Sequence, residues 1–250
     1  MYGNCPYGCT YCYLAGAKGV WNSPTVKIFV NLPEVLSRID KVANGCGRAT
    51  TFFLGKSQDA LALDPLSAYS TKLVPFFAQH KFARALFLTK AASVEHLLKL
   101  KHEEKTTIAW SLNARQISSC YERNVPSISA RLAAMEKCAR YGYPIAASIE
   151  PVLPVDGWQA AYGSLLEEIF SRVQLKRLSF GRFYLSPGSI HLMRRKLPTD
   201  DTLVQFLEMR RKEQAFSKHD RFFHDHACRM LAKLARSMQP NLRITSLHAR

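Results

Sequence analysis

Short apolar runs alternate with helical patterns from about residue 50 to residue 180, and this alternation constrains the fold more than any other feature. The runs predict strands at residues 51–54, 85–89, 107–112, 145–149 and 175–180. The segments between them predict helices at residues 65–79, 93–100, 128–141 and 158–170. Strands that are apolar almost throughout and separated by helices are typical of a parallel sheet covered on both faces. Five such strands predict an α/β fold, a partial (β/α) barrel of parallel strands, with a doubly wound open sheet as the alternative.

The pattern changes after residue 180. Residues 183–198 predict a loop, residues 201–217 an amphipathic basic helix, residues 231–238 a further helix, and the last residues a tail. No linker rich in Gly, Pro or Ser separates these segments from the strands. We therefore expect a partial barrel over residues 1–185 and a basic helical C-terminal extension over residues 186–250.

The charge is strongly positive. Lys and Arg number 35 against 19 Asp and Glu, which gives a net charge of +16. Basic clusters such as residues 194–196 and 210–212 crowd the C-terminal third. This excess predicts a nucleic-acid partner, and the alternatives are a basic protein that is merely soluble or one that docks to an acidic partner. No apolar run reaches the roughly 18 residues of a spanning helix and no signal peptide precedes the cysteines, so we expect a cytoplasmic protein with no membrane partner.

Three cysteines, Cys5, Cys9 and Cys12, lie close together with the spacing CxxxCxxC. A structural zinc site would need a fourth ligand nearby, and a disulfide would leave one thiol over and require an oxidising compartment. A 4Fe-4S cluster held by three cysteines accounts for the number of thiols better, and it leaves one iron open to bind a reactive molecule.

The motif, with Tyr11 directly before Cys12, resembles that of radical S-adenosylmethionine enzymes. Longer segments resemble the spore photoproduct lyase family in the same order over roughly residues 2–185: "CTYCYL", "VNLPEVL", "ALFLTK", "WSLNA" and "CARYGYPIAASIEPVLPVDGW". The resemblance implies that Cys5, Cys9 and Cys12 hold the cluster, whose open iron binds S-adenosyl-L-methionine. In that family a 5′-deoxyadenosyl radical takes a hydrogen from a thymine lesion in DNA, and the bond between the bases breaks. An electron donor such as a flavodoxin or ferredoxin is the expected protein partner.

The resemblance also assigns further site residues. Ser57, Lys90 and Ser111 occupy the positions where the family holds S-adenosyl-L-methionine, with Asn113 close by and Tyr11 beside the cluster. Tyr11 and Tyr13 match tyrosines proposed to relay the returning hydrogen. Lysine and hydroxyl groups at strand ends can bind a carboxylate and ribose hydroxyls. The alternatives are that Lys90 caps the barrel mouth, Ser111 bonds to backbone, and the tyrosines pack around the cluster.

The chain departs from the family at two points. Lys56 aligns with the cysteine that donates hydrogen in the lyases, and lysine has no weak S–H bond with which to replace it. Lys56 could instead take a catalytic role by pairing with a phosphate or a substrate anion. The few residues before Cys5 are also too short for the first barrel strand, so we expect a truncated or mis-started chain, or a barrel without that strand.

Three functions therefore stay open. The first is a lyase-like radical enzyme that acts on a DNA lesion. The second is a radical S-adenosylmethionine enzyme on a different substrate, as Lys56 suggests. The third is a non-catalytic, basic nucleic-acid-binding protein that keeps only the barrel.

Overall fold

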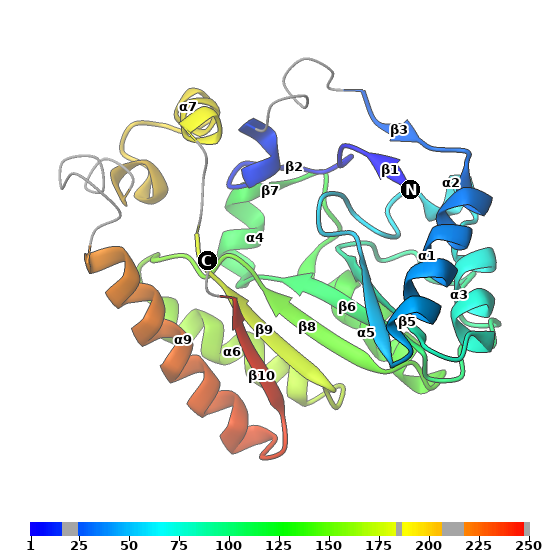
Figure 1. Cartoon of the computed structure of the whole chain (residues 1–250). Coiled ribbons are helices and arrows are strands. Elements are labelled where there is room, and N and C mark those ends of the chain that lie inside the picture. The colour runs from blue at the N-terminus through cyan, green and yellow to red at the C-terminus, as the bar shows by residue number, and fades with distance from the viewer. Residues whose placement is uncertain (17–24, 184–186, 207–217, 248–250) are drawn as a thin grey trace. The chain divides into compact units, whose positions relative to one another are not determined.

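The computed structural model describes residues 1–16, 25–183, 187–206 and 218–247 (Figure 1). The elements are, in chain order, β1 (Tyr2–Gly3), β2 (Gly8–Cys9), the 3-10 helix η1 (Tyr13–Gly16), β3 (Lys27–Ile28), α1 (Leu32–Cys46), β4 (Thr50–Leu54), α2 (Asp64–Ser67), α3 (Ser70–Gln79), β5 (Ala83–Thr89), β6 (Thr106–Leu112), α4 (Arg115–Tyr121), β7 (Glu122–Arg123), α5 (Ile128–Arg140), β8 (Ile145–Ile149), α6 (Trp158–Phe170), β9 (Arg177–Gly181), α7 (Pro187–Lys196), α9 (Lys218–Met238) and β10 (Arg243–Leu247).

Six of these strands form one sheet in the order β10-β9-β8-β6-β5-β4. β4 pairs parallel with β5, β5 with β6, and β9 with β10. The spatial order follows the chain order without reversal, whereas a doubly wound sheet needs a switch point. The predicted α/β class is therefore confirmed, and the doubly wound alternative is wrong. All five predicted strands occur, with bounds within two residues of those expected.

The sixth strand, β10, lies where the sequence predicted a tail. Its residues pair in register with β9, from Arg243 opposite Arg177 to Leu247 opposite Gly181. That prediction is wrong because the segment Arg243–Leu247 gains its hydrogen bonds from β9, a partner far away in the sequence. At the other end of the chain, β1 pairs antiparallel with β3 and not with the six-stranded sheet.

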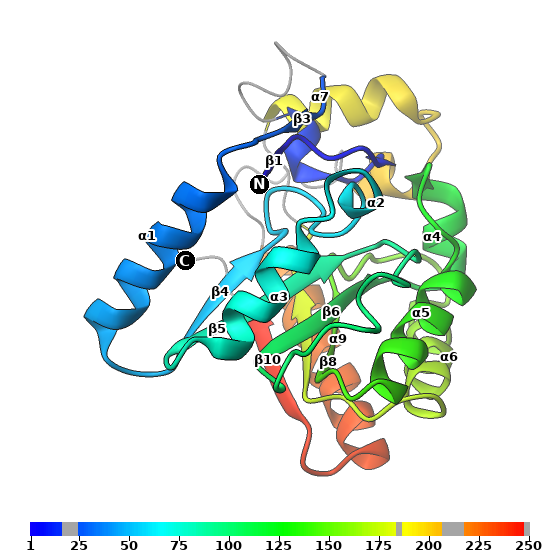
Figure 2. The same ribbon diagram turned by 90° about the vertical axis from the view of Figure 1, so that its right-hand side faces the viewer.

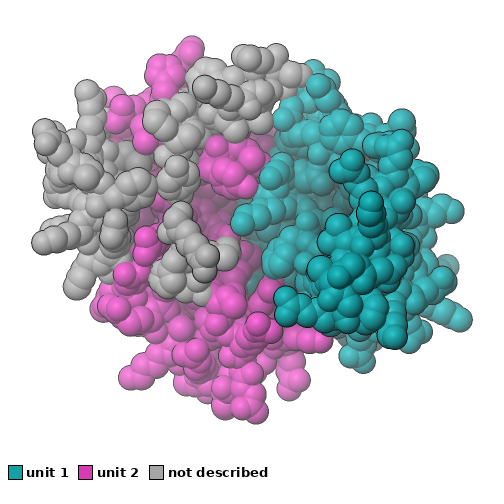
Figure 3. Space-filling view, in the orientation of Figure 1, with its two compact units in different colours: residues 1–6, 25–111, 129–147 teal, residues 7–24, 112–128, 148–250 magenta. Residues whose placement is uncertain are grey.

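The chain divides into two compact units, coloured teal and magenta in Figure 3. Unit 1 comprises Met1–Pro6, Thr25–Ser111 and Ser129–Ala147, and unit 2 comprises Tyr7–Pro24, Leu112–Ile128 and Ser148–Arg250. Unit 2 combines segments from both sides of residue 185. The domain boundary expected at that residue stays a prediction.

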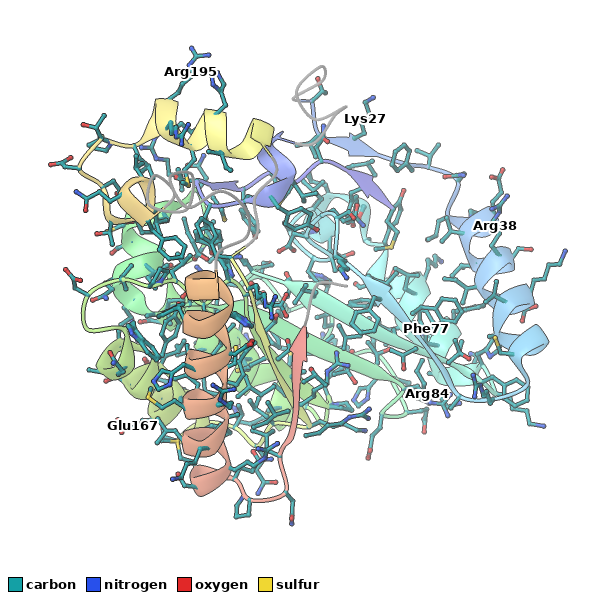
Figure 4. All side chains as sticks on the ribbon, turned by 60° about the vertical axis from the view of Figure 1, so that its left-hand side comes forward. Lys27, Arg38, Phe77, Arg84, Glu167 and Arg195 are labelled. Atoms are coloured by element: carbon teal, nitrogen blue, oxygen red, sulfur yellow. The ribbon has the colours of Figure 1, made fainter. Side chains whose placement is uncertain are left out.

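In unit 1, helices α1 and α3 lie beside β4 and β5 (Figure 2). Helix α1, which the sequence analysis missed, has Pro33 in its first turn and buries Leu32, Ile39 and Ala43. It ends at Gly47, whose φ of 62° is left-handed and favours glycine. Helix α3 buries Phe77, a side chain labelled in Figure 4.

Two helix predictions in unit 1 fail for local reasons. The helix expected at residues 65–79 divides into α2 and α3 because Ala68 adopts a left-handed φ of 50°. The helix expected at residues 93–100 is a series of turns, in which the amide of Leu97 donates to Val94 O and that of Leu100 to Leu97 O. These bonds span three residues instead of the four of an α-helix.

In unit 2, α6 matches its predicted bounds and packs against α9. Helix α7 stands where the sequence predicted a loop: Pro187 opens it, and three basic residues in its last turn, Arg194–Lys196, complement the helix dipole. Figure 4 shows Arg195 projecting outward from α7. Helix α9 begins at Lys218, well before the predicted residue 231. Most of the basic helix predicted at residues 201–217 lies outside the described residues.

In the part of the chain that the structure describes, no helix is long and apolar enough to span a membrane.

Candidate functional site

The cysteine loop is anchored to a segment much later in the chain. In unit 2, β2 pairs antiparallel with β7, so that Gly8 lies opposite Arg123 and Cys9 opposite Glu122. The amide of Thr10 donates to Tyr121 O at 2.7 Å, and the amide of Cys12 donates to Cys9 O at 3.2 Å. Cys9 and Cys12 therefore share one tight turn, and β7 fixes the position of that turn within the unit.

Tyr11 and Tyr13 have different surroundings. The Tyr11 side chain is buried, and its hydroxyl donates a short hydrogen bond to Glu122 Oε1. Ser118 Oγ donates to the other carboxylate oxygen of Glu122 at 2.7 Å, and Glu122 is itself buried. Tyr13, in η1, is 42% exposed. The Tyr11 hydroxyl thus has a structural role, whereas Tyr13 is open to solvent.

This difference separates the two readings of the tyrosines, packing and hydrogen relay. We expect Tyr11→Phe to lower the free energy of unfolding by about 1–3 kcal/mol, because it removes a donor from a buried carboxylate. Tyr13→Phe should change it by less than about 0.5 kcal/mol. Chemical denaturation of both variants measures these values. Equal stability losses in the two variants would contradict the assignment of a structural role to Tyr11 alone.

The donor chemistry of the three cysteines fits an iron-sulfur cluster. All seven cysteines lie among the described residues, and none forms a disulfide, so Cys5, Cys9 and Cys12 are thiols. Cys5 belongs to unit 1, and Cys9 and Cys12 belong to unit 2. Over the described ranges, no three or more His, Cys, Asp or Glu side chains form a group that could hold a metal ion. Ligation of a cluster by the three cysteines therefore stays a prediction, based on their spacing.

Two of the residues expected to bind S-adenosyl-L-methionine lie together in unit 1. Lys90 follows the C-terminal end of β5, and Ser111 lies near the end of the neighbouring strand β6. Lys90 Nζ donates to Ser111 Oγ at 3.0 Å. This pair presents an ammonium and a hydroxyl at one edge of the sheet, an arrangement suited to a ligand carboxylate.

Ser57 and Lys56 lie on the loop that follows β4, and both are exposed. The loop turns at Gly55, whose φ is 101°, and a Cβ at that position would lie 2.3 Å from Leu88 O. The amide of Ala60 donates to the same oxygen at 3.1 Å. Only glycine allows this close approach of the loop to β5.

Asn113 is fully buried in unit 2, and its side chain bonds to backbone. Its Nδ2 donates to Pro151 O at 3.0 Å, and its Oδ1 accepts from the amide of Ala114 at 3.0 Å. Asn113 thus holds the backbone after β8, where Glu150 packs across Gly181. A Cβ at Gly181 would lie 2.3 Å from Glu150 Cγ. These contacts favour a structural role for Asn113, and cofactor binding by it stays a prediction.

Arg182, at the end of β9, contacts a group of side chains on α9. Its Nε donates to His224 Nδ1 at 3.2 Å, and its Nη2 donates to Asp225 Oδ1 at 3.2 Å. His224 Nε2 lies 3.2 Å from Cys228 Sγ, and both side chains are buried. Burial lowers the pKa of His224, and the ring joins β9 to α9 through its contacts with Arg182.

The sequence analysis missed three buried acidic residues, Asp59, Asp64 and Glu122. Asp59 lies in the apolar segment "DALALDP" just after the first strand of the sheet, and an acidic residue so placed is a weak signal of a buried role. Burial raises the pKa of the Asp59 carboxyl, while hydrogen bonds from Thr89 and from backbone amides lower it. Nothing in the local sequence marks Glu122, because its partner Tyr11 comes from the distant cysteine loop.

Comparison with known proteins places these features in a family. The family model described as spore photoproduct lyase matches residues 1–185. The chain is 30% identical over 171 residues to a spore photoproduct lyase of Geobacillus sp. (strain Y412MC61), covering 68% of this chain and 50% of that protein. It is 30% identical over 166 residues to that of Bacillus subtilis (strain 168), covering 66% of this chain and 48% of that protein. The chain thus spans about half the length of these curated relatives.

Solved structures show the same fold. A spore photoproduct lyase complexed with dinucleoside spore photoproduct matches with a TM-score of 0.80 at 21% identity, over 99% of this chain and 75% of that one. A mutant spore photoproduct lyase with bound AdoMet and dinucleoside spore photoproduct gives a TM-score of 0.79 at 21% identity, over 98% of this chain and 74% of that one. Streptococcus suis SuiB bound to S-adenosylmethionine gives a TM-score of 0.57 at 13% identity, over 99% of this chain and 49% of that one. The predicted partial-barrel fold is confirmed.

Proposed function

The chain belongs to the spore photoproduct lyase family, and from that membership we propose that it is a radical S-adenosyl-L-methionine enzyme that acts on a DNA lesion. The observation that carries the proposal is the pairing of Lys90 Nζ with Ser111 Oγ at the ends of neighbouring strands. Solved relatives bind AdoMet and dinucleoside spore photoproduct, and the net charge of +16 suits a polyanionic substrate.

Each group of residues has a distinct task in this proposal. Cys5, Cys9 and Cys12 would hold a 4Fe-4S cluster, with Tyr11 fixing the loop by its bond to Glu122. When bound and reduced, the cluster would supply one electron to S-adenosyl-L-methionine, whose S–C5′ bond would break to give methionine and a 5′-deoxyadenosyl radical. Lys90 would pair its ammonium with the carboxylate of that cofactor, and Ser111 and Ser57 would donate hydroxyl hydrogen bonds. We assign the hydrogen relay to Tyr13, which is 42% exposed in η1, and not to Tyr11, whose hydroxyl is bonded to Glu122.

The role of Lys90 is testable by substitution. We expect Lys90→Ala to raise the Kd for S-adenosyl-L-methionine about 10- to 100-fold, because a charge-assisted hydrogen bond is lost. The control is Lys137→Ala in the same unit, where Nζ pairs at 2.8 Å with Glu95 Oε1 on the surface. Anaerobic calorimetry on reconstituted protein measures both affinities. Equal affinities in the two variants would contradict the role of Lys90.

The reaction itself needs a direct test. Reconstituted protein is incubated anaerobically with a reductant, S-adenosyl-L-methionine and an oligonucleotide that contains the spore photoproduct. The expected products, measured by chromatography and mass spectrometry, are 5′-deoxyadenosine and repaired thymines. An intact lesion without any 5′-deoxyadenosine would overturn the proposal. Weaker binding of the oligonucleotide at higher salt is expected in parallel.

A second candidate is a radical enzyme on a different substrate, which the exposed Lys56 on the loop after β4 favours. 5′-Deoxyadenosine formed without repair would support it over the first. Absence of iron and sulfide after reconstitution would instead favour the non-catalytic nucleic-acid-binding protein. For either radical enzyme, we infer a reducing cytoplasmic location and a flavodoxin-like or ferredoxin-like electron donor, consistent with the absence of disulfides among the described cysteines.

A further inference from the structure

Asp59 is a buried carboxylate with four hydrogen-bond donors around it, all within unit 1. Its Oδ1 accepts from the amides of Leu61 and Ala62, at 3.0 and 2.8 Å, and from Thr89 Oγ1 at 2.6 Å. Its Oδ2 accepts from the amide of Lys90 at 2.5 Å. The side chain is 6% exposed. One carboxylate thus joins the loop that carries Ser57 to the residue that reaches Ser111.

The two carboxylate oxygens of Asp59 accept hydrogen bonds from different donors. Oδ1 shapes the loop after β4 and holds the Thr89 hydroxyl, whereas Oδ2 accepts from the amide of Lys90. The backbone beyond Lys90 is held in turn, since the amide of Ala91 donates to Thr89 Oγ1 at 2.9 Å and the indole of Trp110 donates to Ala91 O at 3.0 Å. The main chain at Lys90 is therefore fixed on both sides.

We propose that Asp59 is a positioning residue, which fixes the Lys90 backbone so that the Lys90 ammonium meets Ser111 and the carboxylate of S-adenosyl-L-methionine. The inference rests on the proposed function, because it assumes that Lys90 binds this cofactor. A lysine side chain has many rotamers, and a fixed backbone reduces the entropy lost when the ammonium is held in one place. Asp59 itself needs no contact with the cofactor.

A second buried carboxylate in the same segment provides the matched control. Asp64 is 1% exposed, and its Oδ1 accepts from the amide of Ser70 at 2.9 Å. Its Oδ2 lies against His96 Nε2. Asp64 stabilises the start of α3, and none of its described contacts is with Thr89 or Lys90. Asp59→Asn and Asp64→Asn therefore change two similarly buried carboxyl groups, but only the first acts on Lys90.

Asp59→Asn tests this role most directly because it keeps the shape of the side chain. The amide oxygen can still accept the three bonds now made to Oδ1, while the amide nitrogen replaces Oδ2 and opposes the N–H of Lys90, donor against donor. We expect the Kd for S-adenosyl-L-methionine to rise about 10-fold in Asp59→Asn and less than about twofold in Asp64→Asn. Thermal unfolding of both variants shows how much stability each loses. Thr89→Val, which removes one donor to Asp59, is the milder substitute if Asp59→Asn does not fold.

A double-variant cycle distinguishes positioning from general stabilisation. If Asp59 acts through Lys90, the added loss of affinity caused by Asp59→Asn should disappear in the Lys90→Ala background. A loss of the same size in that background, or an equal loss in Asp64→Asn, would overturn the proposal.

One further measurement separates this inference from the proposed function. The amide proton of Lys90 should resonate downfield in the unmodified chain, and upfield of that position in Asp59→Asn, without any cofactor present. A chain with this shift that binds no S-adenosyl-L-methionine would overturn the proposed function and the cofactor role of Asp59, but leave its contact with Lys90 intact. An unchanged Lys90 resonance in Asp59→Asn would overturn the positioning role even if the chain binds the cofactor.

Discussion

Replacing Cys12 with alanine is expected to abolish cluster assembly, and with it all cleavage of S-adenosyl-L-methionine. Two thiolates on the loop cannot replace three, since each would hold one iron of the four and leave two without protein ligands. Iron and acid-labile sulfide per chain, together with the visible absorbance of anaerobically reconstituted protein, measure the loss. The expected change is from one cluster per chain to none.

The matched control is Cys46→Ala. Cys46 is exposed at the end of α1 and does not belong to the CxxxCxxC motif, so its replacement should leave the iron content unchanged. Cys120→Ala, on the exposed side of α4, is a second control. A full cluster in Cys12→Ala, or loss of the cluster in both controls, would contradict the assignment of the three ligands.

Gly55→Ala is expected to destabilise the fold by about 3 kcal/mol or more. The added Cβ would lie 2.3 Å from Leu88 O, and the φ of 101° is unfavourable for any residue with a side chain. The obstacle is backbone of β5, which cannot move aside as a flexible side chain would. Urea denaturation followed by circular dichroism measures the change in the free energy of unfolding.

Gly47→Ala provides the comparison. Gly47 also has a positive φ, of 62°, but among the described residues no atom beyond its chain neighbours lies within 4 Å of the position of a Cβ there. Left-handed strain alone should cost about 1 kcal/mol. Comparable losses at Gly55 and Gly47 would show that the contact with Leu88 O does not hold the loop against β5.

The parts of the fold that the sequence predicted are those set by local composition. The five predicted strands are continuous apolar runs, and α6 carries its own helical periodicity between Trp158 and Phe170. Helix α1 also had local signals, Pro33 near its start and Gly47 after its end, and these were overlooked. β10 was unpredictable in a different way, because a short segment near the end of the chain becomes a strand only beside β9.

The residues of the candidate site also differ in whether the local sequence could predict their contacts. Lys90 and Ser111 could be expected to meet because the carboxyl ends of neighbouring parallel strands share one edge. Asn113 also follows a strand, but its side chain bonds to Pro151 O and to the backbone of Ala114. The importance of Asp59 could not be read from spacing, since it arises from contacts with Thr89 and Lys90 across the sheet.

The pairing of β2 with β7 has a consequence for the biogenesis of the protein. During synthesis Cys9 leaves the ribosome long before Glu122, so the cysteine loop stays without its β-sheet partner while β4, β5 and β6 are being made. Metal loading should therefore begin only after residues 122–123 have been made. Nascent chains stalled before residue 121 are expected to carry no iron, even in cells rich in assembly scaffolds, whereas released chains should acquire it.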